Sequence, residues 1–121
     1  MKLAAFLIAV LGILNMSAQT FEAFQRELIN HNQAEPALEG DFCKWHITAS
    51  HVIWEAGDGH SVDIHQVTDY LDTKQVYKMN TYGQEYLLEI NKDIKSDRYF
   101  LKYTPKQDTS WQAIYHCVKR P

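Results

Sequence analysis

Cysteine is scarce in this sequence, and basic residues are outnumbered. Two cysteines in 121 residues are too few for a disulfide-dense scaffold. Twelve basic residues against 15 acidic ones give a net charge of −3, so the chain has no basic excess with which to bind nucleic acid. Charged residues at 22% and apolar residues at 45% are ordinary for a globular chain and argue against wholesale disorder. The length suits a single domain.

Long apolar runs are absent except at the start of the chain. After Lys2, the segment Leu3–Leu14 carries no charge. Twelve residues are too few to span a bilayer, but they suit the apolar region of a signal peptide. Small residues follow as far as Ala18, where we expect cleavage; the alternative is an uncleaved anchor helix. Residues 1–18 therefore predict a secreted or periplasmic protein with no membrane span in the mature chain.

The end of this segment also carries a resemblance. Met16-Ser17-Ala18-Gln19 resembles the signal ends of exported proteins from bacteria of the Bacteroidota. The rest of the chain is similar in layout to small, exported, β-rich proteins of that group, whose functions are uncharacterised. The resemblance implies a compartment and no particular activity.

Residues 19–41 are expected to form an amphipathic helix followed by a loop. Phe21, Phe24 and Leu28 are spaced i, i+3 and i+7, which would place them on one face of a helix over residues 20–31. This apolar face would either pack on a sheet or form an arm that docks a partner.

From Phe42 onward the apolar period changes to two, which is typical of strands. Seven strands with short connections are expected over residues 42–121, with hairpin turns at Gly57–Gly59 and Thr81–Gln84. The fold class is therefore mainly β: a seven-stranded antiparallel meander or small barrel with one N-terminal helix. Closure is favoured because an open sheet would expose two edges.

The two cysteines lie near the two ends of this β region. Cys43 is in the first predicted strand and Cys117 in the last, and each has the same parity as its apolar neighbours. Both side chains should therefore point inward. In an oxidising compartment we expect a Cys43–Cys117 disulfide that joins the terminal strands; the alternative is two buried thiols.

Histidines are the main candidates for metal chemistry. If Gly57-Asp58-Gly59 is a three-residue loop, His51 lies opposite His65, with Asp63 on the same face. Two imidazoles and a carboxylate could hold zinc; the alternative is a solvated polar face. His46 and His116 form a second possible pair of ligands.

The sequence contains no nucleophile and base that can be paired, so a binding protein is favoured over an enzyme. Aromatic residues are plentiful, at 12% of the chain, and would either fill the core or form a ligand or partner face; the candidates for such a face are Phe21, Phe24, Trp54 and Trp111. The favoured function is a binding or interaction module with a protein partner. The alternatives are a lipocalin-like carrier of a small apolar ligand and a metal-dependent enzyme that uses the histidines.

Overall fold

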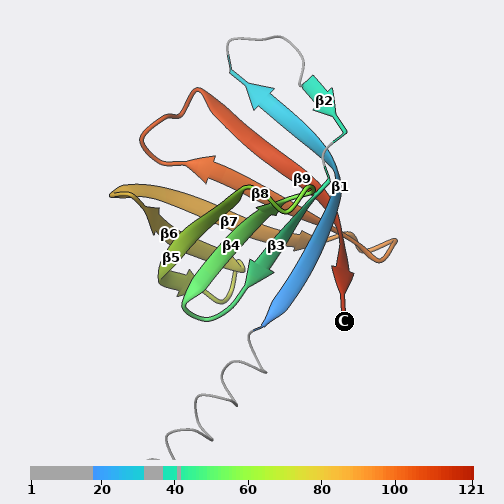
Figure 1. The fold of residues 1–121 in the computed structure, drawn as a ribbon, viewed down its shortest axis with the longest axis horizontal. Helices are drawn as coiled ribbons and strands as arrows, with labels where there is room; N and C mark the ends of the chain where they lie inside the picture. Colours follow the sequence, from blue (N-terminus) through green and yellow to red (C-terminus); the bar gives the residue numbers. More distant parts are fainter. Residues whose placement is uncertain (1–17, 32–36, 41) are drawn as a thin grey trace, which may run out of the picture.

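The computed structural model describes residues 18–31, 37–40 and 42–121. Figure 1 shows these residues as strands that wrap around a common axis. In chain order the strands are β1 (Gln19–Asn30), β2 (Ala37–Glu39), β3 (Cys43–Ile47), β4 (His51–Ala56), β5 (Val62–Leu71), β6 (Val76–Thr81), β7 (Gln84–Lys92), β8 (Arg98–Pro105) and β9 (Trp111–Arg120).

Eight of these strands close into an antiparallel barrel (Figure 1). Strands β3 to β9 pair in chain order, and β1 closes the cycle by pairing with β3 on one side and with β9 on the other. The short strand β2 pairs with β1 at residues 26–28. The mainly β class and the barrel are confirmed. The predicted strands after Phe42 correspond to β3–β9. The count of seven omitted β1 and the short strand β2, which falls in the segment predicted to be a loop.

The predicted helix over residues 20–31 is wrong, because these residues form β1. The pairing of β1 with β9 shifts between Ala23 and Gln25, which marks a β-bulge. A bulge adds one residue to a strand and so changes which positions face inward. Phe21 lies before the bulge and Leu28 after it, and both contribute to the core. Two residues seven positions apart therefore lie on the same side of the strand, which is also the spacing of residues on one face of a helix.

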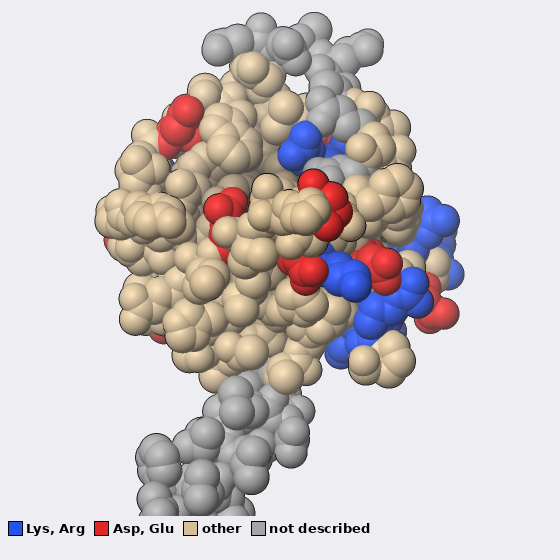
Figure 2. Space-filling view, viewed as in Figure 1, with Lys and Arg blue, Asp and Glu red and all other residues tan. Residues whose placement is uncertain are grey.

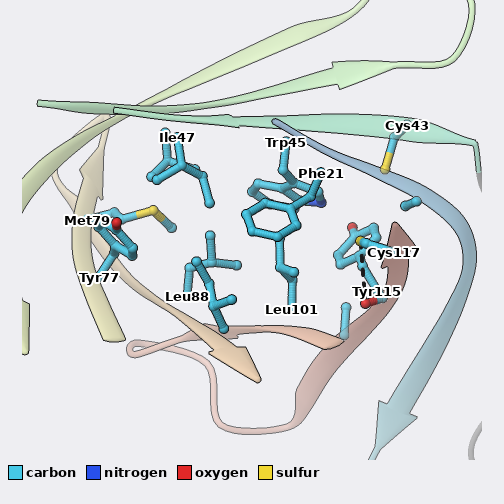
Figure 3. Close-up of a cluster of buried hydrophobic side chains, with 14 residues drawn as sticks. Phe21, Cys43, Trp45, Ile47, Tyr77, Met79, Leu88, Leu101, Tyr115 and Cys117 are labelled. Carbon is cyan, nitrogen blue, oxygen red and sulfur yellow. Dashed lines mark hydrogen bonds between the residues drawn. The ribbon is translucent and has the colours of Figure 1, made fainter. Parts of the chain in front are cut away.

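The barrel interior is packed with apolar and aromatic side chains. Figure 3 shows Phe21, Trp45 and Leu101 meeting near the centre of this cluster, with Met79 and Ile47 to one side. All five are at most 2% exposed. Burying side chains of this size contributes about 1.5–3 kcal/mol each to stability, so this cluster is a main source of the barrel's stability.

The turn between β6 and β7 was correctly predicted from its sequence. Thr81 pairs with Gln84, which leaves Tyr82 and Gly83 as a two-residue loop. Both loop residues have positive φ, 51° and 79°, as a type I′ hairpin turn requires. This tight turn fixes the register of two neighbouring strands in the barrel.

The predicted signal segment lies outside the described residues, apart from Ala18. Among the residues that the structure does describe, none forms a helix with the length and hydropathy needed to cross a bilayer.

Candidate ligand cavity inside the barrel

The hairpin between β4 and β5 decides which of its side chains face the barrel interior. Val52 pairs with His65, and His51 pairs with Gln66. The Ala56 N–H donates to the Ser61 carbonyl at 2.9 Å, so the connecting loop has four residues. The predicted three-residue loop is therefore wrong by one residue. Because successive strand residues face opposite sides, this shift moves every side chain of the partner strand to the other face.

The corrected register separates the predicted zinc ligands. His65 is inside the barrel and 3% exposed, and Asp63 lines the same interior cavity. His51 is exposed on the outer face, beside Val62 and Ile64. The predicted site of His51, Asp63 and His65 is thus not assembled. The described residues contain no group of three or more side chains suited to hold a metal ion.

The second histidine pair is not brought together either. His46 lies on β3 and His116 on β9, with β1 between these two strands. His46 Nε2 lies 2.9 Å from Glu55 Oε2, and His116 Nε2 lies 3.8 Å from Glu27 Oε2. Each imidazole is therefore associated with a carboxylate of its own on the outside of the barrel.

The two cysteines are buried thiols and do not form the predicted disulfide. Cys43 and Cys117 both pair with Ala23 of β1, from opposite sides. Their Cα atoms are thus two strand spacings apart, roughly 10 Å, whereas a disulfide needs about 4.4–6.8 Å. Burial, with a smaller contribution from Cys43, raises the pKa of the Cys117 thiol to about 12. The Cys117 thiol donates to the Tyr115 carbonyl oxygen at 3.6 Å (Figure 3).

A cavity of about 200 Å³ opens among the inward-facing side chains of six strands. Its walls combine aromatic rings with a few polar groups. The residues that line it are Arg26 of β1, Trp45 of β3, Trp54 of β4, Asp63 and His65 of β5, Tyr103 of β8 and Tyr115 of β9.

His65 forms part of the cavity wall and is surrounded by aromatic rings. Its ring stacks on Trp45 at 6.3 Å between centroids and contacts Tyr86 and Tyr103 at 5.6 and 5.7 Å. Its Nδ1 is hydrogen-bonded to Thr81 Oγ1. Burial lowers the pKa of His65, and the nearby carboxylate of Asp63 only partly opposes this shift. The imidazole is therefore neutral at neutral pH.

Two tryptophans of the cavity wall carry buried indole N–H groups. Trp45 and Trp54 are direct cross-strand partners, and the Nε1 atoms of both are buried without a hydrogen-bond partner among the described residues. An indole N–H can only donate. Burial also raises the pKa of Tyr103 far above its ordinary value, so its phenol keeps its proton. A buried donor that lacks an acceptor costs about 1–3 kcal/mol.

The aromatic rings of the wall are largely packed against one another. Tyr103 stacks on Tyr86, with centroids 5.1 Å apart and 12° between the planes. Trp45 stacks on His65 and meets the edge of Tyr115 at 5.2 Å. Trp54 takes part in none of the ring pairs found among the described residues. The Trp54 ring is therefore the wall group best able to stack on a ligand.

Arg26 connects the cavity to a second hollow. It also lines a groove of about 390 Å³ together with Leu28, Asn30, Ser110 and Trp111. These residues belong to the inner face where β1 pairs with β9, since Leu28 pairs with Ala113 and Asn30 with Trp111. The cavity and this groove therefore lie next to each other along the barrel wall.

Most charged groups lie on the outer surface. Figure 2 shows Lys and Arg gathered on the side where β9 ends, with acidic groups among them. Arg120 of β9 forms an ion pair there with Glu22 of β1. In the cavity wall the charged groups are Arg26 and Asp63, so the formal charges of the wall cancel.

The structure divides the predicted ligand or partner face among four places. Phe21 is fully buried in the core, whereas Phe24 lies outside, 6.4 Å from the His116 ring and under the guanidinium of Arg98. Trp54 lines the cavity and Trp111 lines the adjacent groove. These four residues therefore do not form one surface.

Four cavity residues, Arg26, Trp45, Tyr103 and Tyr115, are not among the site residues predicted from the sequence. Trp45 has the same inward parity as Cys43 and Ile47 on β3. Tyr103 and Tyr115 share the inward parity of their strands, so period-two analysis of β8 and β9 already contained the signal. Arg26 faces inward only because of the bulge in β1, and the sequence gives no local sign of that bulge.

An interior cavity with aromatic walls, in a closed antiparallel barrel, is a common arrangement in proteins that bind small molecules. Comparison of the chain with protein-family models, with curated proteins and with solved structures finds no match. The assignment of function therefore rests on the geometry of the cavity.

Proposed function

We propose that the protein is a binding module that holds a small molecule with one aromatic ring inside the barrel, in the manner of a lipocalin-like carrier. The observation that carries this proposal is the cavity of about 200 Å³ inside the closed barrel, with Trp45, Trp54, Tyr103 and Tyr115 in its wall. A small ligand with one aromatic ring could pack against these rings.

The size of the cavity supports a ligand of about one substituted ring. Pockets for drug-sized ligands typically measure about 300–1,000 Å³, and an engineered cavity of about 150 Å³ in another protein accepts benzene. At about 200 Å³, this cavity has room for a ring with a short substituent. A longer ligand would have to extend past Arg26 into the adjacent groove.

The proposal includes export of the protein. The apolar segment before Ala18 supports a signal peptide, and every described strand lies at Gln19 or beyond. Cleavage after Ala18 would then leave every described strand in the exported chain.

The first test is binding of 2-phenylacetamide, a neutral ring with a short polar substituent, to the ¹⁵N-labelled barrel. We expect saturable shifts of the indole N–H signals of Trp45 and Trp54 in NMR spectra. The indole of Trp111 should shift less, because it is hydrogen-bonded to the Asp108 side chain.

Two neighbouring residues of β4 supply a matched pair of variants. Trp54→Ala removes a cavity wall and should weaken binding about tenfold or more, since a buried ring of this size contributes about 1.5–3 kcal/mol. Ile53→Ala changes the next side chain, which faces the other side of the strand, and should leave the affinity unchanged. If no single-ring probe of any charge binds, or if both variants behave alike, the proposal is wrong.

A further inference from the structure

We infer that the start of β5 is a docking edge for an extended peptide strand in which a basic residue stands between two apolar ones. This inference goes beyond the small-molecule cavity and concerns a second kind of partner. Its structural basis is a gap in the pairing of the barrel, where the backbone of Val62 and Ile64 has a neighbouring strand on one side only among the described residues.

The gap arises because β6 is too short to cover the whole of β5. β5 lies between β4 and β6 (Figure 1), and β4 pairs with residues 62–66. Pairing with β6 begins only at Gln66 and Asn80, since the turn at Tyr82 and Gly83 ends the β6–β7 hairpin there. Residues 62–65 therefore extend past this turn as an open edge.

The hydrogen bonds to the β4 side show which backbone groups point across the open edge. The Ser61 carbonyl accepts from the Ala56 N–H, and the Val67 N–H donates to a carbonyl just before β4, both at 2.9 Å. In an antiparallel ladder, successive residues bond alternately to one neighbour and to the other. The odd-numbered residues of this segment therefore bond toward β4, whereas Val62 and Ile64 direct their N–H and C=O groups away from it.

The side chains on the outer face of this edge are apolar and exposed. Val62 is 51% exposed and Ile64 is 57% exposed. Both line a groove of about 380 Å³ together with Gln66, Asn80 and Tyr82. Residues directly opposite each other in a strand pair lie on the same face. A strand paired with this edge would therefore place two apolar side chains beside Val62 and Ile64.

Asp63 determines the residue between those two apolar positions. Its side chain is exposed on the inner face, and it takes part in none of the ion pairs among the described residues. A partner residue opposite Asp63 has its Cβ about 4.5–5.5 Å away, where lysine or arginine gains a favourable ion pair. Arg26, the other charged group of this wall, is on β1, and β3 and β4 lie between β1 and β5.

A second copy of the chain suits this edge less well. A symmetric antiparallel pairing that uses both Val62 and Ile64 would place Asp63 directly opposite the same residue of the second copy. Like charges in directly opposite positions are destabilising, and an inward-pointing charge is one of the devices that keep open edges from pairing with each other. The edge is therefore suited to a basic strand.

The first experiment adds two acetylated and amidated peptides, Thr-Val-Lys-Val-Thr and Thr-Val-Glu-Val-Thr, to the ¹⁵N-labelled protein. We expect the lysine peptide to shift the amide signals of Val62 and Ile64 saturably and to slow their hydrogen exchange. The glutamate peptide should bind about three- to tenfold more weakly, since it places like charges opposite each other. Equal affinities, or unchanged amide signals at Val62 and Ile64, would show that the inference is wrong.

A third peptide tests whether the contact is made by the backbone. It is the lysine peptide with both valine nitrogens methylated, which removes the N–H groups that would donate to the carbonyls of Val62 and Ile64. We expect this peptide to bind about tenfold more weakly or not at all, because two hydrogen bonds are lost. Undiminished binding would rule out the addition of a strand.

Two variants with the same change of charge test the role of Asp63. Asp63→Lys should reverse the preference, so that the glutamate peptide binds more tightly than the lysine peptide. Asp97→Lys makes the same change at an exposed residue between β7 and β8 and should keep the preference for lysine. An identical preference in the two variants would contradict the inference. So would shifts of the Val62 and Ile64 signals when the protein is concentrated without peptide, because a second copy would then occupy the edge.

Discussion

At the scale of single residues, the barrel interior changes the pKa of His65. Its ring is enclosed by Trp45, Tyr86 and Tyr103 and is 3% exposed. Burial lowers the pKa of His65 relative to the ordinary value, which the unfolded chain retains. When the pH falls below about 6.5, His65 therefore becomes protonated more readily in the unfolded chain than in the folded chain.

This difference predicts how stability depends on pH. The contribution of His65 is fully present above about pH 6.5 and is lost as the pH falls toward its lowered folded-state pKa. We expect the free energy of unfolding, measured with urea, to decrease between pH 7.5 and pH 5.5. The variant His65→Asn should lose less stability over this range, because it has no imidazole to protonate.

The control for this prediction is His51→Asn. His51 is exposed on the outer face of β4, so its removal should leave the pH dependence as it is in the parent protein. An identical pH dependence in the His65 and His51 variants would contradict the assignment to His65.

At the scale of elements, β1 shows how one bulge redistributes the side chains of a strand. Phe21 before the bulge is fully buried and packs against Tyr99, with ring centroids 5.1 Å apart. Phe24 lies at the register shift and contacts His116 and Arg98 on the outside. These two phenylalanines, three residues apart, should therefore differ strongly in their contribution to stability.

Alanine substitutions measure this difference. Phe21→Ala should reduce the free energy of unfolding by about 3–5 kcal/mol, because it leaves a cavity in a packed core. Phe24→Ala should cost much less, since its ring is only half-buried. Urea denaturation of both variants tests this directly. Equal losses would mean that β1 packs in a different register, and a larger loss for Phe24→Ala would support the helical face rejected above.

The strands after Phe42 could be predicted because their buried residues alternate. In β9, for example, Ala113, Tyr115 and Cys117 are all buried, with less buried residues between them. The β6–β7 turn was predictable because Gly83 readily takes the positive φ that the turn needs.

The remaining features depend on irregularities that simple patterns do not encode. The bulge in β1 makes its apolar residues look helical. The loop after β4 has four residues instead of three, and this one residue decides whether His65 faces water or the core. The zinc site and the N-terminal helix failed for this shared reason: both relied on a strictly regular repeat along the chain.

At the scale of the whole molecule, closure by β1 and β9 explains why the cysteines stay apart and why a cavity exists. The sheet closes through backbone pairing over nearly the whole length of β1, so closure needs no covalent bond. Because β1 stands between β3 and β9, the barrel gains an eighth strand. Eight strands enclose an interior just wide enough for side chains to fill or for one small ligand.

Closure also predicts which part of the chain is sufficient and which is indispensable. A chain that begins at Gln19 contains every described strand and should unfold in one cooperative transition.

A chain of residues 19–108 lacks β9, the neighbour of both β1 and β8. It loses the buried side chains of Ala113, Tyr115 and Cys117 and uncovers Phe21 and Leu101, a loss comparable with the ~5–15 kcal/mol that stabilises a typical domain. We therefore expect the shorter chain to show no cooperative transition by near-ultraviolet circular dichroism on heating, while the chain from Gln19 to Pro121 shows one. A cooperative transition in the shorter chain would mean that β1–β8 form a stable open sheet, and that closure by β9 is not what holds the cavity walls in place.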